Sequence, residues 1–136
     1  MITLGVDRVG YSFRTFDSMI HKKLNVYIKI KSLILLVYNI TSTLPSIEKY
    51  NLGSQMCRSS LSIISNLSEG LVKSSPKDKL RFIEMAYASL SELDTQIEIC
   101  FELHYINLEI FKELEEKCIE IAKMLSGLRK RIKSTQ

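Results

Sequence analysis

The sequence predicts an all-α protein, an antiparallel up-down-up-down four-helix bundle that assembles into a homo-oligomer. Two long segments space their apolar residues three and four positions apart, as on one face of an α-helix, and no segment alternates convincingly with period two. The loops expected between helical segments are only a few residues long, so consecutive helices should run antiparallel. With 136 residues, of which 46% are hydrophobic and 25% charged, the chain suits one globular domain with a real core.

The first two helices are bounded by a proline. An apolar pattern over residues 22–43 stops before Pro45, whose ring disfavours helix at the preceding residue. A loop over 45–51 should lead into a second helix at 52–72. Leu33 to Val37 are five consecutive aliphatic residues, so the first helix is apolar around more than one face. This pattern favours self-association; the alternative is a wide stripe that faces only the core.

The third and fourth helices have clear start signals. Ser75 should cap the third helix with Pro76 in its first turn, and Asn107 should cap the fourth. The core positions expected on the third helix are Ile83, Ala86, Leu90, Leu93, Ile97, Cys100 and His104. Those expected on the fourth are Phe111, Leu114, Cys118, Ile121, Leu125, Leu128 and Ile132.

Residues 22–136 form the predicted bundle domain, and residues 1–21 are predicted to be a poorly ordered leader, within which Met19 is a possible alternative start. The leader lacks the uninterrupted apolar segment and cleavage site of a signal peptide. The three cysteines have no metal-binding spacing and are read as reduced core residues. No apolar run is long enough to cross a bilayer. These features predict a cytoplasmic protein.

The second helix also carries a polar stripe, formed by Gln55, Arg58, Ser62, Asn66 and Glu69. If the turn between the second and third helices is centred near residue 75, Arg58 lies level with Glu92, and the two should form a structural ion pair. A structural role is favoured over a catalytic one.

Other chemical signals are absent from the sequence. Neither His21 nor His104 has the Glu-x-x-His spacing of a di-iron bundle, and no glycine-rich phosphate loop is present. We therefore expect no catalytic residues, no metal and no cofactor, and a protein that is not an enzyme.

The net charge of +4 conceals a polarised distribution. In an up-down-up-down bundle, the start of the first helix, the turn between the second and third, and the end of the fourth meet at one end. Twelve bases are expected there: Lys22, Lys23, Lys29, Lys31, Lys73, Lys77, Lys79, Arg81, Arg129, Lys130, Arg131 and Lys133. The opposite end should receive Glu98, Glu102, Glu109, Glu113, Glu115 and Glu116.

Such a basic cluster, repeated around an oligomer, predicts contact with the phosphate backbone of RNA or DNA. Groove-reading motifs and an aromatic ladder for stacking bases are both missing, so recognition of base sequence is not expected. The alternative is a solvated helix end that only favours solubility.

Short motifs in the second and third helices carry a family resemblance. They are Leu44-Pro45, Glu48-x-Tyr50-x-Leu52, Gln55, Arg58, Ser62, Asn66-x-x-Glu69-Gly70, Arg81-Phe82 and Ser89-Leu90-x-Glu92-Leu93-x-Thr95-Gln96. Over about residues 22–133 the chain resembles the four-helix-bundle proteins encoded in 23S ribosomal RNA intervening sequences. It departs from that pattern at Tyr27, where tryptophan is usual, at Ala88, where glycine often precedes Ser89, and at His104, where glycine often precedes Tyr105.

The resembled family is itself similar to the accessory variability determinants of diversity-generating retroelements, which are pentameric basic bundles that associate with a reverse transcriptase and nucleic acid. The resemblance therefore implies a homo-oligomer, expected to be a pentamer, that binds RNA or DNA and has a reverse transcriptase as a possible partner. The competing hypothesis is a protein-interaction scaffold with no direct nucleic-acid role.

Overall fold

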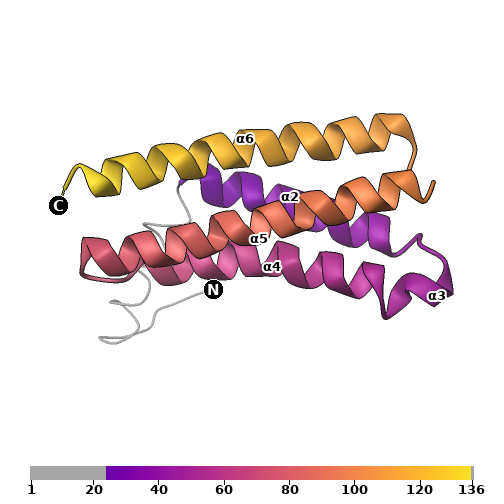
Figure 1. The fold of residues 1–136 in the computed structure, drawn as a ribbon, viewed down its shortest axis with the longest axis horizontal. Helices are drawn as coiled ribbons and strands as arrows, with labels where there is room; N and C mark the ends of the chain where they lie inside the picture. The colour runs from indigo at the N-terminus through magenta and orange to yellow at the C-terminus, as the bar shows by residue number, and fades with distance from the viewer. Residues whose placement is uncertain (1–23, 136) are drawn as a thin grey trace, which may run out of the picture.

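The described part of the chain, residues 24–135, is helical between short turns (Figure 1). This computed structural model contains α2 (Asn25–Thr41), α3 (Ser46–Lys49), α4 (Leu52–Leu71), α5 (Pro76–Glu102) and α6 (Leu108–Lys133). Residues 24–135 contain no strand, and the predicted all-α class with four long helices is confirmed. The predicted leader, together with Lys22 and Lys23, lies outside the described residues.

Two side-chain caps set the starts of the long helices α5 and α6. Ser75 Oγ accepts a hydrogen bond from the backbone N–H of Asp78 at 3.1 Å, and Pro76 occupies the first turn. Asn107 Oδ1 accepts from the N–H of Ile110 at 2.8 Å. Each cap satisfies a helix N–H group that has no partner within the helix. Both predicted starts are confirmed.

The segment predicted to be a plain loop, residues 45–51, contains the short helix α3. Pro45 precedes its first residue with a φ of −57°, an angle that already suits a helical turn. Glu48 then accepts a hydrogen bond from the Tyr105 hydroxyl at 2.8 Å, and this bond raises the pKa of Tyr105. The bond ties α3 to the turn between α5 and α6.

The core runs along the inner faces of all four long helices. The buried apolar residues on α5 and α6 repeat the predicted spacing of three and four, with Phe111 only half-buried. His104 is the exception, because α5 ends at Glu102 and His104 is exposed with a φ of 66°. The expectation that it lies in the core is wrong, since the chain turns away from the helix axis before residue 104.

Side-chain contacts fix the relative directions of two helix pairs. Ser59 Oγ donates to Gln96 Oε1 at 2.7 Å, and the hydroxyls of Ser62 and Ser89 share a hydrogen bond of 2.8 Å. Because the residue numbers rise on α4 as they fall on α5, these helices are antiparallel. Figure 1 shows the α4–α5 turn and the end of α6 at one end, with α3 and the α5–α6 turn at the other.

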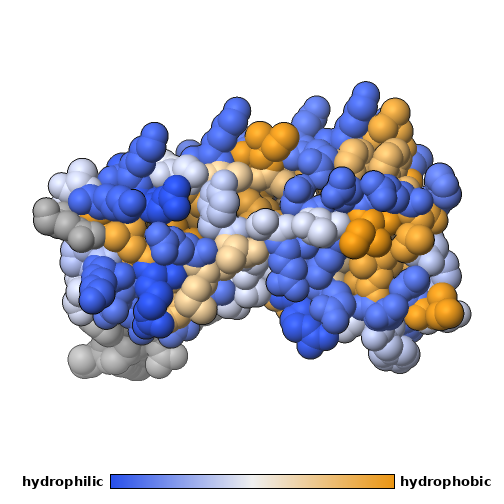
Figure 2. Space-filling view, in the orientation of Figure 1, coloured by the Kyte–Doolittle hydropathy of each residue, from blue (hydrophilic) through white to orange (hydrophobic). Residues whose placement is uncertain are grey.

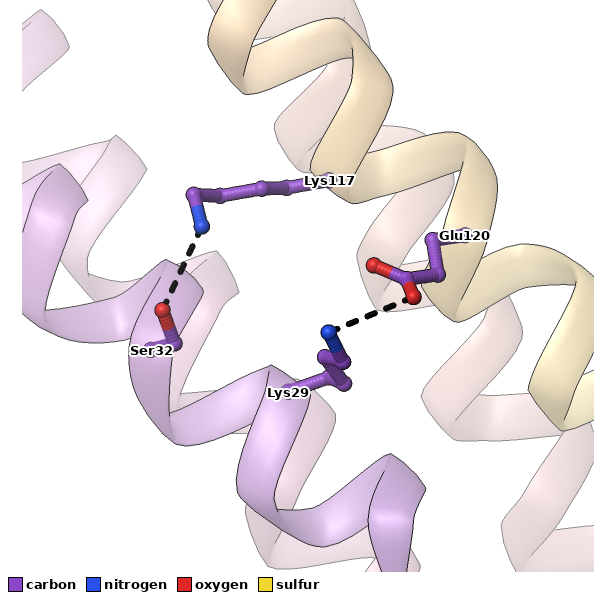
Figure 3. Close-up of polar contacts among 4 residues, drawn as sticks. All are labelled: Lys29, Ser32, Lys117 and Glu120. Carbon is purple, nitrogen blue, oxygen red and sulfur yellow. Dashed lines mark hydrogen bonds and ion pairs between the residues drawn. The ribbon is translucent and has the colours of Figure 1, made fainter.

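The other pair, α2 and α6, is also antiparallel (Figure 3). Lys29 Nζ lies 3.3 Å from Glu120 Oε2, and Lys117 Nζ donates to Ser32 Oγ at 3.4 Å. Residues 29–32 of α2 are therefore level with residues 117–120 of α6.

Candidate nucleic-acid interface

Eight of the predicted bases lie where the α4–α5 turn and the last turns of α6 meet. They are Lys73, Lys77, Lys79, Arg81, Arg129, Lys130, Arg131 and Lys133, and we call them the basic end. The acids in the neighbouring turns of α4 and α5 are Glu69, Asp78 and Glu84. Figure 2 shows hydrophilic surface over this end of the molecule, whereas large apolar areas appear towards the opposite end.

Lys29 and Lys31 do not belong to the basic end. Lys29 pairs with Glu120, which lies thirteen residues before the end of α6 at Lys133. At a rise of 1.5 Å per residue this is about 20 Å along the helix. The prediction that α2 contributes these two bases to the end is therefore wrong, because α2 has only 17 residues and is level with the middle of α6.

Aromatic rings hold several of the bases in place. Lys73 Nζ and Arg81 Cζ lie 5.0 and 4.8 Å from the centroid of the Phe82 ring. Arg129 Cζ lies 5.9 Å from the centroid of Tyr87. These are cation–π distances, which stabilise a base without neutralising its charge. Sequence reasoning missed both rings as site residues, although Arg81-Phe82 is one of the motifs of the family resemblance.

Two lysines at the basic end are engaged within the protein. Lys73, two residues beyond the end of α4, has its Nζ 3.7 Å from Glu69 Oε2 in the last turn of that helix. Lys79 Nζ donates to the carbonyl of Leu71 at 3.1 Å. The second contact satisfies a carbonyl at the end of α4. The bases whose side chains remain exposed are Lys77, Arg81, Lys130, Arg131 and Lys133.

The opposite part of the α5–α6 face carries carboxyl groups close together. Burial, a hydrogen bond with Asp94 and the charges of Asp94 and Glu98 together raise the pKa of Glu115 to about 7, and burial is the largest of these causes. Near neutral pH the Glu115 carboxyl group is therefore partly protonated.

The predicted ion pair between Arg58 and Glu92 is not formed. Arg58 Nη2 donates to Ser54 Oγ at 3.2 Å, and Glu92 accepts a weak hydrogen bond from Gln96 at 3.4 Å. Both side chains are exposed, where an ion pair contributes too little to outweigh local hydrogen bonds and water.

The rest of the polar stripe on α4 makes contacts between and within helices. Ser62 bonds to Ser89 of α5, and Asn66 Nδ2 donates back to the Ser62 carbonyl at 2.9 Å. The neighbouring Ser59 bonds to Gln96 and is buried. These small polar side chains link α4 to α5.

The cysteines are free thiols, and two of them are buried. Burial raises the pKa of Cys100 to about 11 and that of Cys118 to about 12. Over residues 24–135, no group of three or more metal-ligating side chains is close enough to hold an ion. In the same stretch, no helix has the length and apolar character needed to cross a membrane.

Comparison with known proteins agrees with the fold. A family model described as 23S rRNA-intervening sequence protein matches residues 22–127. A crystal structure from Bacteroides thetaiotaomicron, described as a protein with unknown function from the S23 ribosomal protein family, aligns with a TM-score of 0.72. The alignment is 24% identical and covers 77% of this chain and 98% of that one, a likeness that shows a shared fold. Among curated proteins, no match was found.

Proposed function

Because the chain belongs to the 23S rRNA-intervening sequence protein family, we propose that it is a non-enzymatic protein that binds the backbone of RNA or DNA. In this proposal it acts as a homo-oligomer of up-down-up-down bundles in the cytoplasm. The observation that carries the proposal is the basic end, where eight bases outnumber three acids.

The chemistry of the basic end suits phosphate groups. Arginine and lysine side chains donate hydrogen bonds and carry positive charge, and each phosphate that they neutralise releases condensed counterions. An oligomer would present one basic end per copy, which multiplies the number of simultaneous contacts.

Binding in this proposal does not depend on base sequence. The exposed bases lie in the first turns of α5 and the last turns of α6, and the sequence carries no groove-reading motif. Phe82 and Tyr87 already pack against cationic side chains, which leaves their rings less available for stacking on bases.

The family resemblance adds two narrower proposals, a pentameric assembly and a reverse transcriptase as protein partner. Both rest on the similarity to retroelement accessory proteins. Co-purification with a reverse transcriptase, if one is encoded beside this gene, tests the second proposal. Nuclease treatment of the sample then shows whether the two proteins contact each other directly or are held together by nucleic acid that both bind.

The test of nucleic-acid binding is a charge reversal at the basic end. The Lys77→Glu/Arg131→Glu variant changes two exposed bases on different helices. We expect its affinity for a short RNA to fall at least about tenfold at moderate salt, because phosphate contacts are lost. Mobility-shift titration measures the change.

The matched control is Lys49→Glu/Lys112→Glu, which alters the net charge equally but at exposed positions away from the basic end. If both variants lose the same amount of RNA affinity, net charge rather than the basic end determines binding. Absence of RNA binding by the unmodified protein at low salt would contradict the proposal itself.

A further inference from the structure

A second apolar stripe runs along the outer face of α2. Ile28, Lys31, Leu35 and Tyr38 follow one another at intervals of three and four, so they share one helix face. Ile28 is 53% exposed and Leu35 is 68% exposed. This face lies opposite the buried stripe of Val26, Ile30, Leu33 and Val37. The two-sided apolar character predicted for this helix is present, and one of its sides has no cover within residues 24–135.

A groove between α5 and α6 has matching chemistry. Its floor and walls include Tyr87, Ile119 and Ala122, and it encloses about 180 Å³. Ile119 is 51% exposed. At one end of the groove stand the paired carboxyl groups of Asp94 and Glu115. The groove therefore offers an apolar surface beside a site that favours a cation.

The stripe and the groove lie at the same level along the bundle. The contacts of Lys29 with Glu120 and of Ser32 with Lys117 make residues 28–32 level with residues 117–121 (Figure 3). That stretch of α6 includes Ile119, which lines the groove. A rotation about an axis parallel to the helices preserves this level, so it can bring the stripe of one copy opposite the groove of another without any shift along the axis.

We propose that the outer face of α2 in one copy docks into the α5–α6 groove of the next copy, with Ile28 against Ile119 and the Lys31 ammonium beside Asp94 and Glu115. The two surfaces are different, so the contact is head-to-tail and closes into a ring when the rotation permits. This inference rests on the homo-oligomer part of the proposed function and names the surfaces that form it.

The charges facing Glu115 agree with a docked lysine. Asp94 and Glu98 on α5 both raise the pKa of Glu115. The pKa of the neighbouring Cys118 on α6 is raised mainly by burial and also by the charges of Asp94 and Glu115. A cation placed there stabilises the ionised form of Glu115 and replaces the proton that Glu115 carries near neutral pH. Assembly should therefore release a proton near neutral pH and tighten as the pH rises from 6 to 8.

A mixing experiment tests the head-to-tail contact. Ile28→Glu disables the stripe and leaves the groove intact, whereas Ile119→Glu disables the groove and leaves the stripe intact. Each variant alone should be monomeric at about 10 µM, because a charge buried in an apolar contact weakens association strongly. An equimolar mixture should form a heterodimer of twice 15.6 kDa and nothing larger, as measured by sedimentation.

Both isoleucines are about half exposed, so the substitutions should preserve the fold, and circular dichroism checks this. The matched control is Ile99→Glu, at a residue that is 44% exposed on α5 but does not line the groove. It should assemble like the unmodified protein.

The possible outcomes distinguish this inference from the proposed function. If Ile28→Glu and Ile119→Glu are both monomeric but form no heterodimer when mixed, the stripe-and-groove contact is overturned. The same holds if both variants remain oligomeric. In either case the proposed homo-oligomer of the unmodified protein still stands. An Ile119→Glu variant that stays oligomeric but loses RNA binding would assign the groove to nucleic acid instead. A monomeric unmodified protein would overturn both the contact and the homo-oligomer.

Discussion

His104 shows how one residue ends a helix. It has a φ of 66°, its N–H donates to the carbonyl of Phe101 at 2.9 Å, and the next N–H, that of Tyr105, donates to Cys100 at 3.1 Å. This left-handed turn satisfies carbonyl groups at the end of α5 and usually employs glycine. The 3-4 spacing of α5 extends by one further step to residue 104, so periodicity alone could not locate the end.

Replacing His104 by glycine should stabilise the protein. A side chain in the left-handed region is unfavourable by roughly 1–2 kcal/mol, part of which is offset because glycine gains entropy in the unfolded chain. We expect a net gain of roughly 0.5–1 kcal/mol in the free energy of unfolding, measured by urea denaturation. His104→Ala, which keeps a Cβ, should give no gain; equal stabilisation by both would exclude backbone strain as the cause.

The carboxyl pair of Asp94 and Glu115 should make stability depend on pH. Because the folded state raises the pKa of Glu115 from 4.5 to about 7, its contribution to stability is complete below pH 4.5 and is lost as the pH rises through 7. Glu115→Gln keeps the shape but removes the titration. In the Ile28→Glu background, whose groove should stay open, this variant should gain stability over Glu115 between pH 5 and pH 8.

Chemical denaturation at a series of pH values measures that difference. If the free energies of unfolding of the Glu115 and Glu115→Gln proteins differ by the same amount at every pH in this range, Glu115 does not titrate there.

At the scale of single elements, α4 and α5 approach each other closely at Gly70. A Cβ on Gly70 would stand 2.8 Å from the Cβ of Phe82 and 3.3 Å from the carbonyl of Lys79. These atoms belong to a backbone and to the base of a side chain, so neither can rotate away. The glycine in the Asn66-x-x-Glu69-Gly70 motif therefore has a packing role beside the turn that presents Lys73 and Lys77.

Gly70→Ala should consequently destabilise the protein by about 1–3 kcal/mol, the usual range for overpacking. Gly127→Ala is the matched control, because a Cβ there would meet a single atom, Arg131 Nη1, at 4.0 Å. It should stabilise α6 by up to about 1 kcal/mol through helix propensity alone. Thermal and urea unfolding measure both changes, and destabilisation by Gly127→Ala would contradict the interpretation of this helix face.

The helices themselves could be predicted because their signals are local. Ser75, Pro76 and Asn107 act within one turn of the chain, and the core spacing of α5 and α6 follows from helix geometry. The short helix α3 escaped prediction because one turn carries no periodicity. Its place depends instead on the distant hydrogen bond from Tyr105 to Glu48.

At the scale of the whole molecule, the basic end could be predicted only in part. The bases of the α4–α5 turn and of α6 follow from helix order, whereas the level of Lys29 and Lys31 depends on the side-chain contacts between α2 and α6. The proposed contact between stripe and groove could not be derived from the sequence either, because it depends on which residues of α2 and α6 lie level with each other. A protein with a net charge of only +4 thus has one strongly basic end and, away from it, the face that we propose for self-association.

The central claim is that the basic end contacts a nucleic-acid backbone, and the salt dependence of RNA affinity tests it most directly. For the unmodified protein, the logarithm of the association constant should fall linearly with the logarithm of salt concentration, with a slope of about −0.7 per phosphate neutralised on a single strand. The Lys77→Glu/Arg131→Glu variant should give a clearly shallower slope. An affinity that does not change with salt, or equal slopes for the two proteins, would contradict the account.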